Sequence, residues 1–249
     1  MHDFTLPHNW RERQSAYWNA IAQEYDSLYQ NWWSKAEDNE TLAILKSVLP
    51  ARPCDVLDLA CGTGLGYEMC SAILKEVRYV GLDISSQMLT RFKERYPLIP
   101  AYLGRMSDLS NFSSESFDVV ISLYTSFSYT ERPVTTLKEI HRVLKPRGRF
   151  LISLLNRWSL RRMLSLKLRR IEEYRTRNST LLLSTPTITY SRGEVFRCLS
   201  SLGFSELRGG GQGIFAGWFE RDGLWKIDVL TSSRFPMICN TINFHGMKA

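Results

Sequence analysis

Two acidic residues in the first third of the sequence stand at the ends of short apolar runs. Asp58 lies in the run 56–59, which leads into a loop of small residues at 60–64, and Asp83 follows the run 79–82. Glycine lets the backbone approach a ligand closely and adopt angles closed to other residues. A carboxylate at the tip of a strand can accept both hydroxyls of an adenosine ribose. The pattern predicts a nucleotide-type cofactor site, and a tight structural turn is the alternative.

The spacing of the glycines separates two kinds of cofactor. They run Gly62-x-Gly64-x-Gly66, and not G-x-G-x-x-G, the pattern that accommodates a dinucleotide pyrophosphate. Asp58, four residues before Gly62, would repel a diphosphate but suits the ammonium group of a methionine. The sequence therefore favours S-adenosylmethionine over NAD, which stays the weaker alternative because NAD-binding folds also use an acid after the second strand.

Apolar runs alternate with helical segments from Asp55 onward, which indicates parallel βαβ units. Runs such as Val119-Val120-Ile121 lack the alternation of a half-exposed strand, as expected for strands covered on both faces. We expect helices near 64–75, 86–95 and 132–144 and strands at 55–59, 79–82, 101–103, 117–123 and 149–155.

Further segments flank this core. The first 50 residues are predicted to be helical, with a second helix from Asp38 to Leu49, and their aromatic residues fit either core packing or a substrate cage. The stretch from Ser159 to Arg175 is predicted to be one helix, because its apolar residues fall on a single stripe. In the tail we expect a helix near 193–202, strands at 204–208 and 214–219, and a flexible glycine-rich turn at 209–213.

The net charge of +7 is concentrated in one stretch. Residues 157–177 hold seven Arg and one Lys against Glu172 and Glu173. This excess fits either a solvated face or a docking surface for a phosphorylated substrate, a carrier protein, anionic lipid or RNA.

Five cysteines without a CxxC pair and four scattered histidines predict neither disulfides nor a metal site. Without a long apolar run or a secretory signal, we expect a cytoplasmic protein.

Four motifs together resemble the class I S-adenosylmethionine-dependent methyltransferases, particularly the branch with the ubiquinone/menaquinone C-methyltransferases and many small-molecule enzymes. They are 56–64, Gly81-Leu82-Asp83-Ile84-Ser85, Phe117-Asp118-Val119-Val120 and 139–146. The resemblance covers about 25–155 and, weakly, 185–219.

The resemblance implies an α/β fold with a Rossmann-like, seven-stranded, mostly parallel sheet covered by helices on both faces. The last strand belongs to an antiparallel hairpin. We expect an N-terminal helical cap at 1–50, a methyltransferase core at 51–156 and 191–249, and a basic helical insertion after the fifth strand, at 157–190, that serves as a substrate lid.

The resemblance also assigns roles to individual residues. It implies that Asp58 lies near the cofactor's amino group and that Asp83 binds the ribose. The other cofactor contacts that it implies are Ala60, Cys61, Gly62 and Gly64 at the methionine moiety, Ile84 and Met88 beside the adenine, Met106 and Ser107 at its edge, Leu123 with Tyr124 beside the methyl-transfer site, and Tyr25 as the tyrosine that closes over the cofactor. In one departure, Arg105 stands where the family often has an acid, and Asp108 is the candidate substitute.

The chemistry needs little from the protein beyond alignment and exclusion of water, because the cofactor brings an activated methyl group. Two catalytic candidates end strands. Tyr124 is either a pocket wall or a base, and Asn156 either orients a substrate or caps the following helix.

The sequence therefore predicts methyl transfer to O, N or C of a small-molecule acceptor, acidic or lipid-like, in biosynthesis, with the oligomeric state open. One alternative is a tRNA or rRNA methyltransferase that uses the basic insertion. Leu123-Tyr124-Thr125-Ser126 in place of an Asn/Asp-Pro-Pro-Tyr/Phe motif argues against nucleic acid. A protein that binds the cofactor without methyl transfer is the other alternative.

Overall fold

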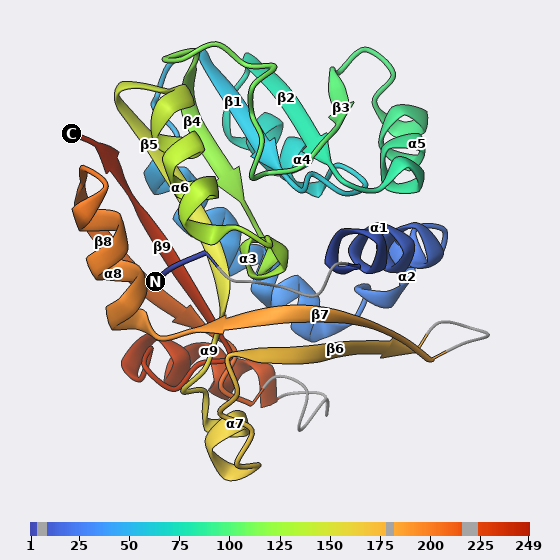
Figure 1. The fold of residues 1–249 in the computed structure, drawn as a ribbon, viewed down its shortest axis with the longest axis vertical. Helices are drawn as coiled ribbons and strands as arrows, with labels where there is room; N and C mark the ends of the chain where they lie inside the picture. Colours follow the sequence, from blue (N-terminus) through green and yellow to red (C-terminus); the bar gives the residue numbers. More distant parts are fainter. Residues whose placement is uncertain (4–8, 178–181, 216–223) are drawn as a thin grey trace.

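A central, mostly parallel sheet organises the chain, as a computed structural model shows for residues 1–3, 9–177, 182–215 and 224–249 (Figure 1). Its parallel part has the order β3-β2-β1-β4-β5. The strands are β1 (Cys54–Leu59), β2 (Val77–Asp83), β3 (Ala101–Leu103), β4 (Phe117–Ser122) and β5 (Leu144–Asn156). The connecting helices are α4 (Leu65–Ile73), α5 (Ser86–Arg95) and α6 (Pro133–Val143). All five strands and all three helices lie where the sequence predicts them, to within a few residues at most ends.

Both faces of the sheet are covered, which explains the unbroken apolar runs. Val119 and Ile121 of β4 face a cluster built with α3 (Trp32–Val48), α4 and α5. Val120, between them, faces a second cluster built with α6 and α8 (Arg192–Ser201). Alternate residues of a strand point to opposite faces, so each strand must be apolar at every position to fill both clusters.

The C-terminal part adds the antiparallel strands that the resemblance implies. β9 (Thr241–Lys248) pairs antiparallel with β5, and β8 (Phe204–Gln212) pairs antiparallel with β9. The tail strand predicted at 214–219 is wrong for residues 214 and 215. Ile214 and Phe215 form a bend, and their N–H groups donate to the Asp228 carboxylate of α9 (Leu224–Arg234). The rest of the predicted strand, 216–219, lies outside the described residues.

The predicted flexible turn at 209–213 is also wrong for most of its length, because residues 209–212 continue β8. A side chain at Gly211 would overlap the Cys239 side chain and the Pro236 carbonyl. Glycine is therefore required here for close packing, and not for a turn.

The insertion differs most from the sequence-based expectation. The long helix predicted from Ser159 to Arg175 is wrong: α7 spans only Leu160–Leu164, and β6 (Ile171–Arg177) forms an antiparallel hairpin with β7 (Leu182–Tyr190). β7 continues the sheet through a parallel pairing of Thr189 and Tyr190 with the end of β5. The sheet thus has nine strands in place of the expected seven. Cross-strand pairing with the threonine-rich β7 outweighs the helical spacing of the basic stretch.

Three N-terminal helices form a cap at the carboxyl ends of the strands, and the C-terminal half of the third also runs along one face of the sheet (Figure 1). They are α1 (Trp10–Ile21), α2 (Tyr25–Leu28) and α3. α3 begins earlier than the helix predicted from Asp38, because Asn31 caps it through a bond from the Ser34 N–H to the Asn31 side chain. Asp38 therefore lies inside the helix and its side chain is available for another contact. The hairpin joins the cap, since the buried Gln14 side chain of α1 donates to the Pro186 carbonyl.

Candidate active site

A cavity of about 380 Å³ lies between the cap and the carboxyl ends of β1, β2 and β4. In open α/β sheets, ligands bind at this edge. The sequence-predicted residues that line it are Tyr25, Ala60, Gly62, Asp83, Ile84, Met88, Met106 and Tyr124. A smaller cavity of about 40 Å³ shares several of these residues and adds Asp58, Cys61 and Leu123. Eleven of the fourteen predicted residues therefore surround one connected region.

The glycine loop and Asp83 form one hydrogen-bonded unit at the cavity floor. The Asp83 carboxylate accepts the Gly62 N–H at 2.9 Å and the Ser85 N–H at 2.8 Å. Gly62 has a φ of +53°, and a Cβ built on it would meet no atom within 4 Å, because it would point into open space. Burial raises the pKa of Asp83 to about 6. The loop thus leaves room for a ligand beside a fixed carboxyl group.

Asp58 is deeply buried beside this loop, with 2% of its surface exposed. Its carboxylate accepts a hydrogen bond from the Tyr79 phenol, and a side chain at Gly66 would overlap it. Burial raises the pKa of Asp58 to about 7, and the nearby Asp83 adds to this increase. Two carboxyl groups that are hard to ionise alone suit a cationic ligand, which would offset the loss of their hydration.

Three predicted site residues lie outside both cavities. Gly64 has a φ of +105°, precedes α4 and faces the Tyr96 ring, which a Cβ would overlap. Ser107 donates to Glu131, and the Asn156 amide donates to the Met237 and Cys239 carbonyls at 2.8 Å each. The geometry gives these three residues structural contacts, so we do not carry them into the proposed site.

Tyr124, two residues beyond the end of β4, stands in strained backbone. Its φ is +52° and that of Thr125 is +63°, in a region that non-glycine residues rarely adopt. Such strain is most often retained at functional sites. The Tyr124 phenol donates to Asp38 Oδ1 at 2.6 Å, which joins the end of β4 to the cap helix α3. Burial, followed by the contact with Asp38, raises the pKa of Tyr124 well above its ordinary value, so the phenol stays protonated.

Aromatic rings form one wall of the cavity. Trp18 packs edge-on against Tyr129 at 5.0 Å and Tyr25 at 6.2 Å between ring centroids, and Tyr129 packs against Tyr174 at 6.0 Å. All four residues line the cavity, whereas Tyr17 is 3% exposed and belongs to the core of the cap. Some aromatic residues of the cap therefore pack in the core, and others line the cavity. Tyr174 was missed because its position depends on the unpredicted hairpin.

Acidic residues that the sequence did not single out line other parts of the cavity. Glu131 accepts a hydrogen bond from Arg11 at 3.0 Å and lies 3.7 Å from Arg105. Arg105 lines the cavity, whereas Asp108, the substitute acid considered from the sequence, is not among its lining residues. Glu37, one residue before Asp38, has its pKa raised to about 7 by burial and by the neighbouring carboxylates. No local motif marks these acids, since tertiary packing alone brings them together.

The cap is fastened to the glycine loop by side-chain bonds. Thr63 donates to Asp26 of α2 at 2.6 Å, and Asp26 pairs with Arg95 of α5 at 3.1 Å. Asn19 of α1 accepts from the Ser85 hydroxyl at 2.7 Å.

Within the described residues, no group of three or more His, Cys, Asp or Glu could hold a metal ion. No helix in the same ranges is long and apolar enough to cross a membrane.

Comparison with known proteins agrees with this geometry. Residues 57–152 match the family model described as "Methyltransferase domain". The chain is 32% identical to a demethylmenaquinone methyltransferase of Lactococcus lactis over 143 residues, covering 55% of this chain and 56% of the relative. It is 30% identical to a malonyl-[acyl-carrier protein] O-methyltransferase of Marinomonas over 149 residues, covering 58% and 55%. The chain thus spans about half the length of these curated relatives.

The fold extends the likeness beyond the matched region. A solved complex of the protein DhpI with SAM and HEP superposes with a TM-score of 0.67 at 17% identity, covering 97% of this chain and 99% of the other. The expected fold class and the expected family are confirmed, and with them the choice against a dinucleotide-binding domain. Over residues 57–152 the chain therefore carries a methyltransferase domain.

Proposed function

We propose that this protein transfers the methyl group of S-adenosylmethionine to a small-molecule acceptor bound between the sheet and the cap. One observation carries the proposal: the Gly62 loop and the buried carboxyl groups of Asp58 and Asp83 lie around two adjoining cavities of about 380 Å³ and about 40 Å³. Small-molecule sites are typically about 300–1,000 Å³. The methionine end of the cofactor carries two cationic groups, the sulfonium and the ammonium, beside one carboxylate, so its net positive charge suits the nearby carboxyl groups of Asp58 and Asp83.

The residues around the two cavities support specific cofactor contacts. Asp83 is held by two backbone N–H groups in a position to accept ribose hydroxyls. Asp58 would face the ammonium group, where a cation favours its ionised form. Ile84, Met88 and Met106 line the adjoining part of the main cavity and would flank the adenine. Ala60, Cys61 and Gly62 would contact the methionine moiety.

The acceptor would occupy the rest of the cavity, beyond Tyr124. Leu123, Tyr25 and the Tyr124 ring would exclude water around the methyl group, which the cofactor supplies in activated form. Because the Tyr124 phenol stays protonated and donates to Asp38, we propose that Tyr124 positions the acceptor and does not act as a base.

An acceptor hydroxyl or amine must lose a proton during transfer, and Glu37 is the candidate that takes it. Glu37 lines the cavity, and a pKa of about 7 is near the optimum for a general base at neutral pH. From the sequence, Tyr124 was the candidate base and Glu37 was not singled out. We therefore assign proton removal to Glu37 and positioning to Tyr124 with Asp38.

The cavity chemistry favours a lipid-like or aromatic acceptor over an acidic one. Trp18, Tyr129 and Tyr174 offer apolar surface, whereas Glu37 and Asp38 would repel an anion. The relatives do not agree on an acceptor, since one is named for demethylmenaquinone and another for malonyl-[acyl-carrier protein], so the choice rests on the cavity lining. We therefore propose an uncharged, largely apolar acceptor, and with it a biosynthetic role.

The cap at 1–50 and the insertion at 157–190, a hairpin in place of a helix, would together form the lid over this acceptor.

The proposal is tested by methyl transfer from isotopically labelled S-adenosylmethionine to a lipid extract, followed by mass spectrometry. Wild-type protein should produce a labelled apolar product, and Asp83→Ala should not at the same cofactor concentration. Cofactor binding by calorimetry without any labelled product in lipid or water-soluble extracts would favour a binding protein that does not catalyse transfer.

A further inference from the structure

Exposed apolar side chains gather on two segments far apart in the sequence. Sixteen large hydrophobic residues are exposed in the described part of the chain, and nine of them lie in 158–171 or 227–237. We call the surface that they form the α7–α9 surface. Its members are Trp158, Leu164, Leu166, Leu168, Ile171, Ile227, Leu230, Phe235 and Met237. A contiguous exposed apolar patch usually marks an interaction site.

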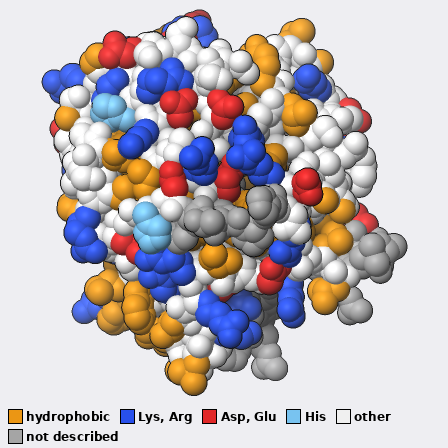
Figure 2. Space-filling view, in the orientation of Figure 1, with side chains coloured by type: hydrophobic (Ala, Val, Ile, Leu, Met, Phe, Trp, Pro, Cys, Tyr) orange, Lys and Arg blue, Asp and Glu red, His pale blue; other side chains and the backbone are white. Residues whose placement is uncertain are grey.

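The two segments lie side by side. The Leu160 N–H donates to the Ile238 carbonyl at 2.9 Å, and the Asn156 amide donates to the Met237 carbonyl. Figure 1 shows α7 and α9 together at the lower end of the molecule. Figure 2 shows hydrophobic side chains along this lower edge with Lys and Arg beside them. The two exposed apolar segments are therefore neighbours on this side of the molecule.

The charge of this surface has a single sign. Residues 157–171 contain no acid, and the single acid in 225–238, Asp228, is 4% exposed and accepts two backbone N–H groups. The exposed cations are Arg161, Lys167, Arg169, Lys226 and Arg234. The α7–α9 surface thus combines apolar groups with uncompensated positive charge.

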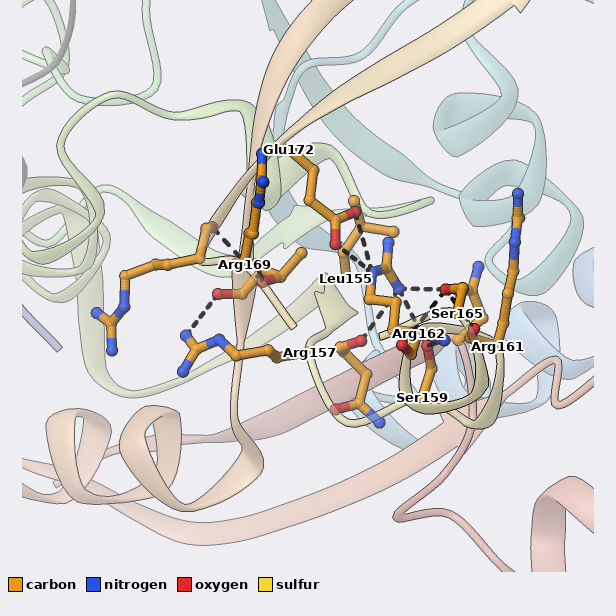
Figure 3. Close-up of polar contacts among 12 residues, drawn as sticks. Leu155, Arg157, Ser159, Arg161, Arg162, Ser165, Arg169 and Glu172 are labelled. Atoms are coloured by element: carbon orange, nitrogen blue, oxygen red, sulfur yellow. Dashed lines mark hydrogen bonds and ion pairs between the residues drawn. The ribbon is translucent and has the colours of Figure 1, made fainter. Parts of the chain in front are cut away.

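Arginines of the same stretch fall into two groups. Arg162 donates to Glu172 at 3.1 Å and to the Asn240 side chain at 2.9 Å, and Arg157 pairs with Glu194 at 2.8 Å. In Figure 3, dashed lines converge on the Arg162 guanidinium, whereas the guanidinium of Arg161 has none. Arg162 and Arg157 therefore hold the insertion in place. Arg161, Lys167 and Arg169 make no such bonds within the described chain and remain available to a partner.

Leu166 gives an independent sign of function. Its φ is +53°, in the left-handed region, and 87% of its surface is exposed. A branched side chain in this conformation is unfavourable by about 1–2 kcal/mol, and burial within this chain does not offset it. Asn or Gly would relieve the strain. A leucine held outward is explained if its side chain is buried against something else.

The surface adjoins the acceptor end of the cavity. Asn240, which bonds to Arg162, lines the cavity together with Thr241 and Leu155. Gly62 and Asp83, which we propose to bind the cofactor, line the same cavity from the β1 and β2 ends. A molecule on the α7–α9 surface would therefore be near the place where the acceptor enters.

We propose that the α7–α9 surface docks on an anionic lipid membrane and presents the acceptor end of the cavity to it. Leu164, Leu166 and Trp158 enter the boundary between headgroups and acyl chains, and Arg161, Lys167 and Arg169 lie against lipid phosphates. Interfacial binding depends on this combination of apolar burial and attraction to anionic lipid. RNA would use the cations but would leave the leucines without a role.

The test measures binding of the full chain to vesicles by co-sedimentation. Vesicles of phosphatidylcholine with phosphatidylglycerol should bind the protein, and vesicles of phosphatidylcholine alone should bind it weakly. The triple variant Arg161→Glu, Lys167→Glu, Arg169→Glu should lose at least about ten-fold in affinity, since each cation near such a surface contributes measurably. The double variant Leu164→Ser, Leu166→Ser should also lose affinity, at unchanged net charge.

Matched controls separate this surface from general effects. The charge control is the triple variant Lys75→Glu, Lys93→Glu, Lys138→Glu, which makes the same change of charge at exposed positions elsewhere. The apolar control is the double variant Leu98→Ser, Leu103→Ser, which removes exposed leucines far from α7. Both controls should bind as wild type does. Loss of binding in the controls, or full binding in both surface variants, would overturn the proposal. It would be overturned too by salt-sensitive tRNA binding that the charge variant loses and the leucine variant keeps.

Vesicle binding needs neither cofactor nor turnover, so its failure and a failure of the proposed methyl transfer are separate results. Calorimetry with S-adenosylmethionine should give wild-type affinity for both surface variants, because no substituted residue lines the cavity.

Discussion

Tyr124, two residues beyond the end of β4, donates a 2.6 Å hydrogen bond to Asp38 of α3. The bond joins the carboxyl edge of the sheet to the cap, and the Tyr124 backbone is strained there at a φ of +52°. The two residues are 86 positions apart in the sequence, so under the proposed function the alignment of the acceptor would rest on a long-range contact.

Tyr124→Phe should lower kcat while leaving cofactor affinity nearly unchanged. The substitution removes the donor to Asp38 and keeps the ring that walls the cavity. Loss of about 1.4 kcal/mol of alignment would reduce kcat ten-fold. Asp38→Asn, which keeps an acceptor oxygen for the phenol, should retain most of the activity. Steady-state kinetics beside calorimetry makes the comparison, and equal kcat for Tyr124→Phe and wild type would remove the positioning role.

Asp83→Ala should weaken S-adenosylmethionine binding by about 1.5–3 kcal/mol, the value of lost hydrogen bonds to a charged group. The Gly62 and Ser85 N–H groups would also lose their acceptor. Titration calorimetry measures the loss, and NAD titrated into wild-type protein serves as the control that should show no comparable binding. Unchanged affinity in the variant would rule out Asp83 as the ribose ligand.

Cofactor affinity should rise with pH between about 5 and 8. The pKa values of Asp83 and Asp58 are raised to about 6 and about 7, so both carboxyls lose charge on acidification through this window. Because both folded-state values exceed the ordinary value, these groups make the unliganded fold less stable as pH rises from about 4 to 7. A cationic ligand reverses this effect and releases protons on binding.

The proton release can be measured from the dependence of the binding enthalpy on the buffer. Near pH 6.5 it should be largest for wild-type protein and smaller for Asp58→Asn, whose side chain does not titrate. Affinity that is flat across the window in wild-type protein would contradict a cationic ligand at Asp58.

Gly62→Ala and Gly64→Ala form a matched pair. Both glycines have positive φ, so each substitution adds strain of about 1 kcal/mol. The new methyl group at Gly62 enters open cavity, whereas at Gly64 it meets the Tyr96 ring. Gly62→Ala should mainly weaken cofactor binding, and Gly64→Ala should mainly lower the Tm. Calorimetry measures the cofactor affinity of both variants, and thermal unfolding measures their Tm. If Gly64 were the ligand contact, Gly64→Ala would show the larger loss of affinity and Gly62→Ala the smaller one.

Particular residues show how far sequence reasoning reaches. Val119, Val120 and Ile121 predict a buried strand because covering helices require apolar groups on both faces. Asp83 is found because its place after a strand carries the chemistry. Tyr174 and Glu131 were missed because long-range packing alone brings them to the cavity. Leu164 and Leu168 were misleading, since they fit a helical stripe but belong to an exposed surface.

Arg162→Ala and Arg161→Ala should separate the two kinds of arginine in the basic stretch. Arg162 is 11% exposed at its side chain and bonds to Glu172, Asn240 and the Asn156 carbonyl. Its removal leaves buried acceptors without a donor, so we expect a loss of about 2–4 kcal/mol in the free energy of unfolding. Arg161 is exposed and makes no such bonds through its guanidinium, so its removal should change stability by less than about 0.5 kcal/mol. Chemical denaturation measures both values, and comparable losses would mean that the basic stretch is not divided between anchoring and docking.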